Sequence, residues 1–129
     1  MTDTLVTTAF DTKTGVARLT FNRPEALNAI NVPLAEAFLE AVQEINKLSG
    51  VRCIVLTGKG RAFMAGGDVS SMAGTSEQAG AAISAILDAV NPAILLLRSM
   101  DAPVIAAVRK RRTGAWSTTL PRKANSRTG

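Results

Sequence analysis

The stretch RAFMAGGDV, residues 61–69, places two adjacent glycines directly before a carboxylate. Glycine adopts backbone conformations that other residues avoid, and it allows a ligand to approach the main chain closely. A strand followed by Gly-Gly and a polar residue that opens a helical turn can direct backbone N–H groups toward an anion. Anion binding by the main chain is therefore the chemistry that this stretch supports. For an isolated AGGD, a tight turn that requires two glycines remains an alternative.

The residue inventory excludes several other kinds of site. The chain has no histidine and a single cysteine, Cys53. Catalysis by Ser-His-Asp or Cys-His groups and metal binding by histidine are therefore excluded, and so is an internal disulfide framework. The segment MTDTLVTTAF has neither the basic start nor the apolar core of a secretory signal. The most apolar run, residues 93–97, is too short to span a bilayer. We expect a cytoplasmic protein without a membrane partner.

The elements that would position the glycine stretch follow from hydrophobic periodicity. Residues 5–10 and 16–21 predict a β-hairpin with Gly15 in its turn. A helix of about four turns is predicted from Pro33 onward, with Asn31 as its N-cap and Gly50 as its stop. Residues 51–57 form a nearly continuous apolar run, which is typical of a strand buried on both faces.

A second helix and a final strand follow the glycine stretch. Thr75 and Gln78 have capping-box spacing before a long apolar helical pattern that runs to Leu97, with Pro92 expected to kink it. PVIAAV, residues 103–108, predicts another buried strand. The alternation of strands and helices indicates an α/β fold of one domain, with right-handed crossovers and a largely parallel sheet.

Three segments together resemble one known family. NRPEALNAI at 22–30, VRCIVLTGKGRAFMAGGDV at 51–69 and DAPVIAAV at 101–108 occur in an order and at a spacing similar to those of the crotonase superfamily, the enoyl-CoA hydratases and isomerases. The resemblance covers about residues 4–108. It implies a spiral of β-β-α turns, of which this chain would hold a truncated N-terminal portion, and an acyl-CoA or enoyl-CoA as substrate. Coenzyme A would be part of that substrate, and no separate cofactor is implied.

The resemblance also implies roles for individual residues. The N–H of Gly67 would be one oxyanion-hole donor to the thioester carbonyl of the substrate. Residues of the same loop would contact the CoA moiety or shape its pocket: Ala65, Gly66, Asp68 and Val69. Ala26 and Leu27 would line the other side of the CoA site. For Asp68, a cap on the turn after Gly67 remains an alternative to a ligand role.

Beyond Val108 the sequence departs from the family pattern. There the family has a glycine-rich turn that opens a helix, whose first turn supplies the second oxyanion donor and, in hydratases, a catalytic glutamate. Aligned without gaps, Gly114 matches and Ala115 falls at the second donor. Lys110 replaces the first glycine, and Thr118 replaces the glutamate. Hydration requires a general base and a general acid, so we expect weak or absent hydratase activity from this chain.

The segment 109–129 also differs from the rest of the chain in charge. It carries seven basic and no acidic residues, whereas the preceding residues carry eight basic and ten acidic ones. We expect a disordered basic tail and consider three origins for it: an interaction arm, a localisation signal, or loss of the coding frame after Val108. We favour the third, because the change falls inside a strand–helix junction.

The leading hypothesis is therefore an enoyl-CoA hydratase/isomerase-family protein that binds an acyl-CoA thioester and stabilises its enolate, impaired by truncation. The alternative is a noncatalytic protein that uses its basic tail on nucleic acid or an acidic partner. We do not expect nucleic acid to be the partner under the leading hypothesis. The homotrimer that is usual in the family cannot be assumed, because its C-terminal helices have no counterpart in this sequence.

Overall fold

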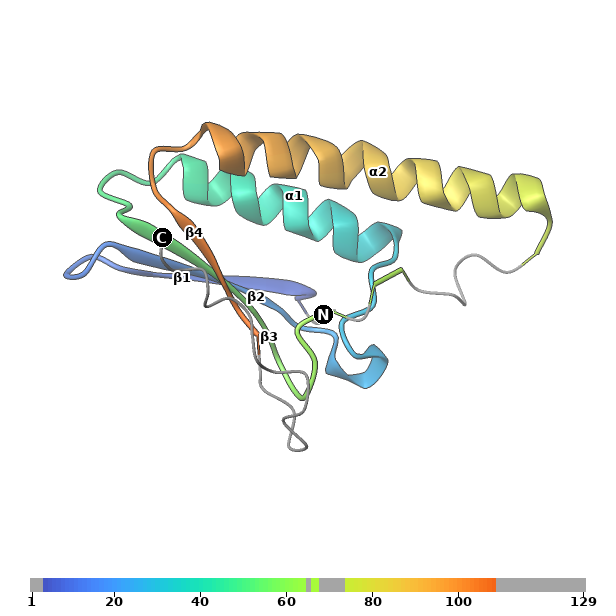
Figure 1. Ribbon diagram of the computed structural model, residues 1–129, viewed down its shortest axis with the longest axis horizontal. Coiled ribbons are helices and arrows are strands. Elements are labelled where there is room, and N and C mark those ends of the chain that lie inside the picture. Colours follow the sequence, from blue (N-terminus) through green and yellow to red (C-terminus); the bar gives the residue numbers. More distant parts are fainter. Residues whose placement is uncertain (1–3, 65, 68–73, 109–129) are drawn as a thin grey trace, which may run out of the picture.

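The computed structural model describes residues 4–64, 66–67 and 74–108. The elements in chain order are β1 (Val6–Asp11), β2 (Val16–Phe21), the 3-10 helix η1 (Pro24–Ala26), α1 (Val32–Asn46), β3 (Cys53–Gly58), α2 (Ser76–Ser99) and β4 (Val104–Ala107). The strands form a sheet of order β1-β2-β3-β4, and both helices lie on one face of it (Figure 1). The expected α/β fold is confirmed. The segment 109–129 lies outside the described residues.

The hairpin and the parallel pairs are those that the sequence predicts. β1 pairs with β2 in antiparallel register from Val6↔Phe21 to Asp11↔Val16, whereas β2–β3 and β3–β4 are parallel. Gly15 closes the hairpin turn with a φ of 79° and donates its N–H to the Asp11 carbonyl at 2.8 Å. The positive φ explains why glycine occupies this position.

The core lies between the sheet and α1. Alternate residues of β2, namely Ala17, Leu19 and Phe21, are buried on the helix side of the sheet, while Arg18 is exposed. The α1 residues that share their cluster are Leu34, Phe38, Ala41, Val42 and Ile45, whereas the buried Ala35 packs with Ile86 and Ala89 of α2. The predicted cap of this helix is confirmed, because the Asn31 side-chain oxygen accepts a hydrogen bond from the Leu34 N–H at 3.0 Å. Such a cap satisfies a backbone donor that has no partner within the helix.

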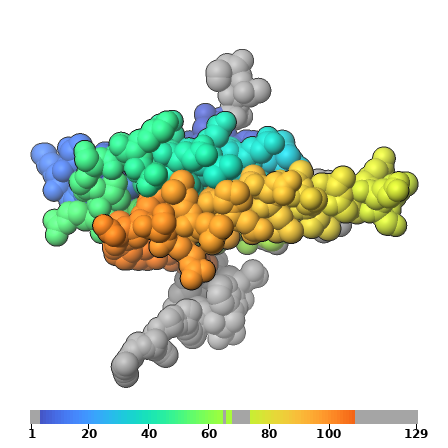
Figure 2. Space-filling model, turned by 90° about the horizontal axis from the view of Figure 1, so that it is seen from above, coloured from blue at the N-terminus to red at the C-terminus, as the bar shows by residue number. Residues whose placement is uncertain are grey.

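Helix α2 begins as predicted but is covered less completely than α1. Thr75 and Gln78 form the reciprocal capping box, and Pro92 lies inside a helix that continues through it to Ser99. Four residues of α2 are buried: Ile86, Ala89, Ala93 and Leu97. The first turns of α2 extend beyond the end of α1 (Figure 2). Ile83, Leu87, Ile94 and Leu95 are 42–64% exposed.

The length of α2 bears on the expectation, drawn from the sequence, that no apolar segment is long enough to span a bilayer. Its most apolar 18-residue window has a mean hydropathy of 1.8, and 22% of that window is buried. Within the described residues, α2 is thus one helix whose length and composition would allow it to cross a bilayer, although the run 93–97 alone is too short. Core helices of soluble proteins share these properties, so length and composition do not by themselves assign a membrane.

The two predictions of strands buried on both faces are wrong for the described part of the chain. In β3 only Ile54 is buried, and every residue of β4 is exposed. The helices cover the face that carries Ile54, whereas Val55 and its partner Ile105 belong to the opposite face. β4 is also an edge strand in the described sheet. These strands are therefore as apolar as strands buried on both faces, although the described elements bury only part of β3 and none of β4.

Candidate functional site

The candidate site is built from two loops at the carboxyl ends of β2 and β3. The first, residues 23–31, is separated from the end of β2 by one residue and passes through η1. Leu27 and Asn28 then adopt left-handed conformations with φ values of 55° and 57°. Such conformations are costly for most residues and are better tolerated by asparagine. The loop therefore turns sharply at Leu27 and Asn28 before α1 starts.

The second loop follows β3 and contains the glycine stretch. The Ile30 N–H donates to the Gly66 carbonyl at 2.6 Å, and Ile30 and Gly67 form an isolated parallel β-bridge. Gly66 has a φ of 98°, a conformation that a side chain would strain. The first loop thus holds Gly66 and Gly67 through main-chain pairing.

The pairing leaves the Gly67 N–H available. Gly66 supplies the carbonyl for the bond to Ile30, and within the described residues the Gly67 N–H donates no hydrogen bond. Gly67 is also exposed. A backbone N–H of an exposed residue that has no acceptor within the described residues is able to donate a hydrogen bond to an oxygen of a ligand.

The predicted site residues can be compared with this arrangement. Ala26 and Leu27 lie in the loop that bridges Gly67, and both are half-buried. The structure therefore brings their segment together with Gly66 and Gly67, which the resemblance implies. Their contact with a ligand stays a prediction. Ala65, Asp68 and Val69 lie outside the described residues, so their roles also stay predictions.

One residue that sequence reasoning did not single out holds the two loops together. Asn28 is fully buried, and its side-chain amide bonds to main-chain groups of both loops. The available signal was an asparagine inside a segment with apolar neighbours, ALNAI, directly before a helix cap. A polar residue in such a place is expected to have internal partners.

The charged side chains near the two loops differ in their surroundings. The Arg23 side chain donates from Nη1 to the Ala29 carbonyl at 2.8 Å, so this guanidinium supports the first loop. Lys59 and Arg61 are exposed. In residues 4–64, 66–67 and 74–108, no group of three or more acidic, cysteine or histidine side chains could hold a metal ion.

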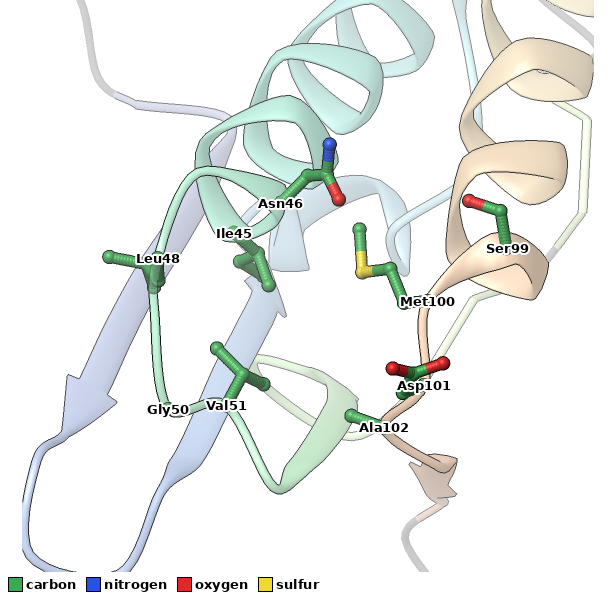
Figure 3. A pocket seen from close by; sticks show the side chains of 9 residues that line it. All are labelled: Ile45, Asn46, Leu48, Gly50, Val51, Ser99, Met100, Asp101 and Ala102. Atoms are coloured by element: carbon green, nitrogen blue, oxygen red, sulfur yellow. The ribbon is translucent and has the colours of Figure 1, made fainter.

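A separate open pocket of about 320 Å³ lies at the other end of the sheet (Figure 3). The C-terminal ends of α1 and α2 and the segments that lead into β3 and β4 surround it. Its lining residues are Ile45, Asn46, Leu48, Gly50, Val51, Ser99, Met100, Asp101 and Ala102. In open sheets with parallel strands, ligands bind at the carboxyl ends of the strands, so this pocket is not the candidate site.

Comparison with known proteins identifies the family to which the chain belongs. The sequence model of the enoyl-CoA hydratase/isomerase family matches residues 11–115, and the chain belongs to this family. It is 33% identical over 108 residues to the 1,2-epoxyphenylacetyl-CoA isomerase of Escherichia coli, covering 81% of this chain and 40% of that protein. It is 36% identical over 67 residues to the small ribosomal subunit protein mS47 of Schizosaccharomyces pombe, covering 52% of this chain and 16% of that protein.

Solved structures agree with the family assignment. The crystal structure of the enoyl-CoA hydratase from Mycobacterium smegmatis superimposes with a TM-score of 0.70 at 31% identity, covering 84% of this chain and 41% of that one. The chain thus spans about 40% of the length of the isomerase and the hydratase that it matches. The recognition of the family and of its fold from three sequence segments is confirmed.

Proposed function

We propose that this chain binds the thioester group of an acyl-CoA or enoyl-CoA, with the Gly67 N–H as a hydrogen-bond donor to the thioester carbonyl. The observation that carries this proposal is the exposed Gly67 N–H, which has no acceptor in the described residues while Gly66 is fixed by Ile30. Family membership supports the ligand class, since one relative is named as a CoA-thioester isomerase.

The chemistry of this ligand class fits a main-chain donor. Removal of a proton beside a thioester, and addition to its conjugated double bond, both place negative charge on the carbonyl oxygen. A preorganised donor that stabilises this charge lowers the barrier by roughly 2.7–4 kcal/mol. The proposed contribution of the described residues is to bind the thioester and polarise its carbonyl. A base and an acid would be needed for turnover.

Family membership alone does not assign catalysis, because one relative is named as a ribosomal protein. The direct test is therefore binding and carbonyl polarisation, which need no turnover. Crotonyl-CoA labelled with ¹³C at the thioester carbonyl is titrated into the protein, and its carbonyl stretching frequency is measured by difference infrared spectroscopy. We expect saturable binding and a shift of the stretch to lower frequency.

Two substitutions at position 67 provide the matched comparison. Gly67→Pro removes the N–H but keeps the Gly66 carbonyl that pairs with Ile30, whereas Gly67→Ala keeps the N–H. Gly67 is not among the described glycines with positive φ, so neither substitution is opposed by the sign of that angle. We expect Gly67→Pro to abolish the frequency shift and to weaken binding roughly 2- to 10-fold. An unchanged shift in Gly67→Pro would contradict the role of this donor.

A further inference from the structure

We propose that Asn28 is the positioning residue of the site, because its side-chain amide sets the separation between the loop that carries Ile30 and the loop that carries Gly67. This inference rests on the proposed function for its catalytic meaning. The positioning itself is a geometric property that can be measured without any ligand.

The side-chain amide of Asn28 is fully buried and hydrogen-bonded. Asn28 has no exposed surface, and it is the one polar or charged residue that is buried in the described part of the chain. Its Oδ1 accepts a hydrogen bond from the Arg23 N–H at 2.7 Å. Its Nδ2 donates to the Lys59 carbonyl at 3.0 Å and to the Ala62 carbonyl at 2.7 Å. Both amide hydrogens are thus used, and loss of either bond would leave the fully buried Asn28 amide with an unpaired polar group.

The groups that bond to the Asn28 amide come from both loops. Arg23 belongs to the first loop, whereas Lys59 and Ala62 belong to the turn that leads from β3 to the glycine stretch. The amide therefore joins the two loops from inside. Two residues further on, Ile30 joins the same loops at the surface through Gly66. A shift of the first loop would move both connections together.

The turn after β3 packs tightly around the Asn28 amide. A Cβ built on Gly58 would collide with the carbonyls of Ala62 and Phe63 and would lie 2.8 Å from the Asn28 Nδ2. The Phe63 ring packs edge-on against Phe21, with 5.7 Å between the ring centroids. The turn after β3 is therefore fixed between the core and the Asn28 amide. This arrangement leaves little freedom for the start of the glycine stretch.

The test compares two asparagines that each donate to a main-chain carbonyl. Asn28→Asp keeps the size of the side chain but replaces the donor by an acceptor, and Asn28→Gly removes the side chain while allowing the left-handed φ. Asn22→Asp is the matched control, because Asn22 Nδ2 donates to the Thr4 carbonyl at 2.8 Å, away from the glycine stretch. Hydrogen exchange is followed by NMR at the Ile30 N–H and at the Ile54 N–H, which bonds to Pro103 at the opposite end of β3.

We expect exchange at Ile30 to accelerate roughly tenfold relative to Ile54 in both Asn28 variants, and to stay unchanged relative to Ile54 in Asn22→Asp. Equal acceleration at Ile30 and Ile54 would mean that Asn28 only stabilises the fold, and would overturn the proposal. An unchanged Ile30 would overturn it as well. If Asn28→Asp does not fold, the same criterion applies to Asn28→Gly.

The catalytic meaning is tested separately with ¹³C-labelled crotonyl-CoA. If wild-type protein shifts the carbonyl stretch, we expect Asn28→Gly to reduce the shift while Asn22→Asp preserves it; a full shift in Asn28→Gly would overturn the link to Gly67. If wild-type protein produces no shift, the proposed function fails. The exchange comparison at Ile30 then still decides whether Asn28 positions the loop.

Discussion

The two α-helices in the described part of the chain are both rich in apolar residues but differ in how much of each is buried. α1 buries six residues, among them Leu34 and Val42 with no exposed surface, whereas the longer α2 buries four and leaves Leu95 64% exposed. In the view from above, α1 and α2 lie side by side, and the first turns of α2 extend beyond α1 (Figure 2). Only Ala93 and Leu97 of α2 join the buried cluster that α1 shares with the sheet, whereas Ile86 and Ala89 pack with Ala35 of α1. Apolar periodicity in a sequence therefore predicts that a segment is a helix, but it does not predict how much of that helix other elements bury.

The largest expected effect follows from truncation of the covered core. Leu19→Ala removes a side chain with no exposed surface, which extends from β2 and packs against α1. We expect a loss of about 2–5 kcal/mol in the free energy of unfolding. Leu95→Ala, the same change on the exposed side of α2, is expected to stay within about 0.5 kcal/mol of wild type. Urea unfolding followed by circular dichroism measures both, and equal losses would contradict the difference in cover.

A smaller effect is expected at the glycine that approaches the Asn28 amide. Gly58→Ala places a methyl group against the carbonyls of Ala62 and Phe63. We expect a loss of about 1–3 kcal/mol, because this site has no room to expand. Gly80→Ala in α2 is the control, since nothing lies within 4 Å of a Cβ there, and it is expected to stabilise the helix by up to about 1 kcal/mol. Denaturant midpoints that move in the same direction would contradict the packing described at Gly58.

Removal of the helix caps is expected to have effects of intermediate size on stability. Asn31→Ala removes the cap of the covered helix and is expected to cost about 1 kcal/mol of global stability. Thr75→Ala breaks the capping box of α2, and the residues around this cap, 74–78, are all exposed. We expect this first turn to fray locally, with faster hydrogen exchange there and little change in the global free energy of unfolding. A full global loss in Thr75→Ala would show that α2 unfolds only together with the core.

The smallest effect on stability is expected from charges on the exposed side of α2. The double variant Leu87→Lys with Leu95→Glu replaces two side chains that are 46% and 64% exposed. We expect the free energy of unfolding to change by no more than about 0.5 kcal/mol. The concentration at which the protein aggregates should rise, because an exposed apolar patch is reduced. Light scattering during concentration tests this, and an unchanged onset would mean that α2 does not mediate the aggregation.

Local signals in the sequence predicted most of the fold, because the residues responsible lie close together. The hairpin at Gly15, the Asn31 cap and the Thr75–Gln78 box each depend on neighbours within a few positions. The exposure of β4 was not predicted, because burial depends on elements that lie elsewhere along a chain. The run PVIAAV has the same composition whether or not something covers it.

The candidate site was predicted in part for a similar reason. The resemblance identified the segments with Ala26 and Gly67, and the structure brings these segments together through Ile30 and Gly67. The role of Asn28 depends on carbonyls 31 and 34 residues further along the chain. The apolar neighbours of Asn28 indicate that its side chain has internal partners, but no local pattern identifies these distant carbonyls.

The order of the strands in the sheet also bears on how the protein forms during synthesis. Neighbours in the sheet are neighbours in the chain, from β1 to β4. The hairpin needs only its own short turn, and each later strand meets an edge that has already been translated. We therefore expect a nascent chain to pair these four strands in the order in which they leave the ribosome.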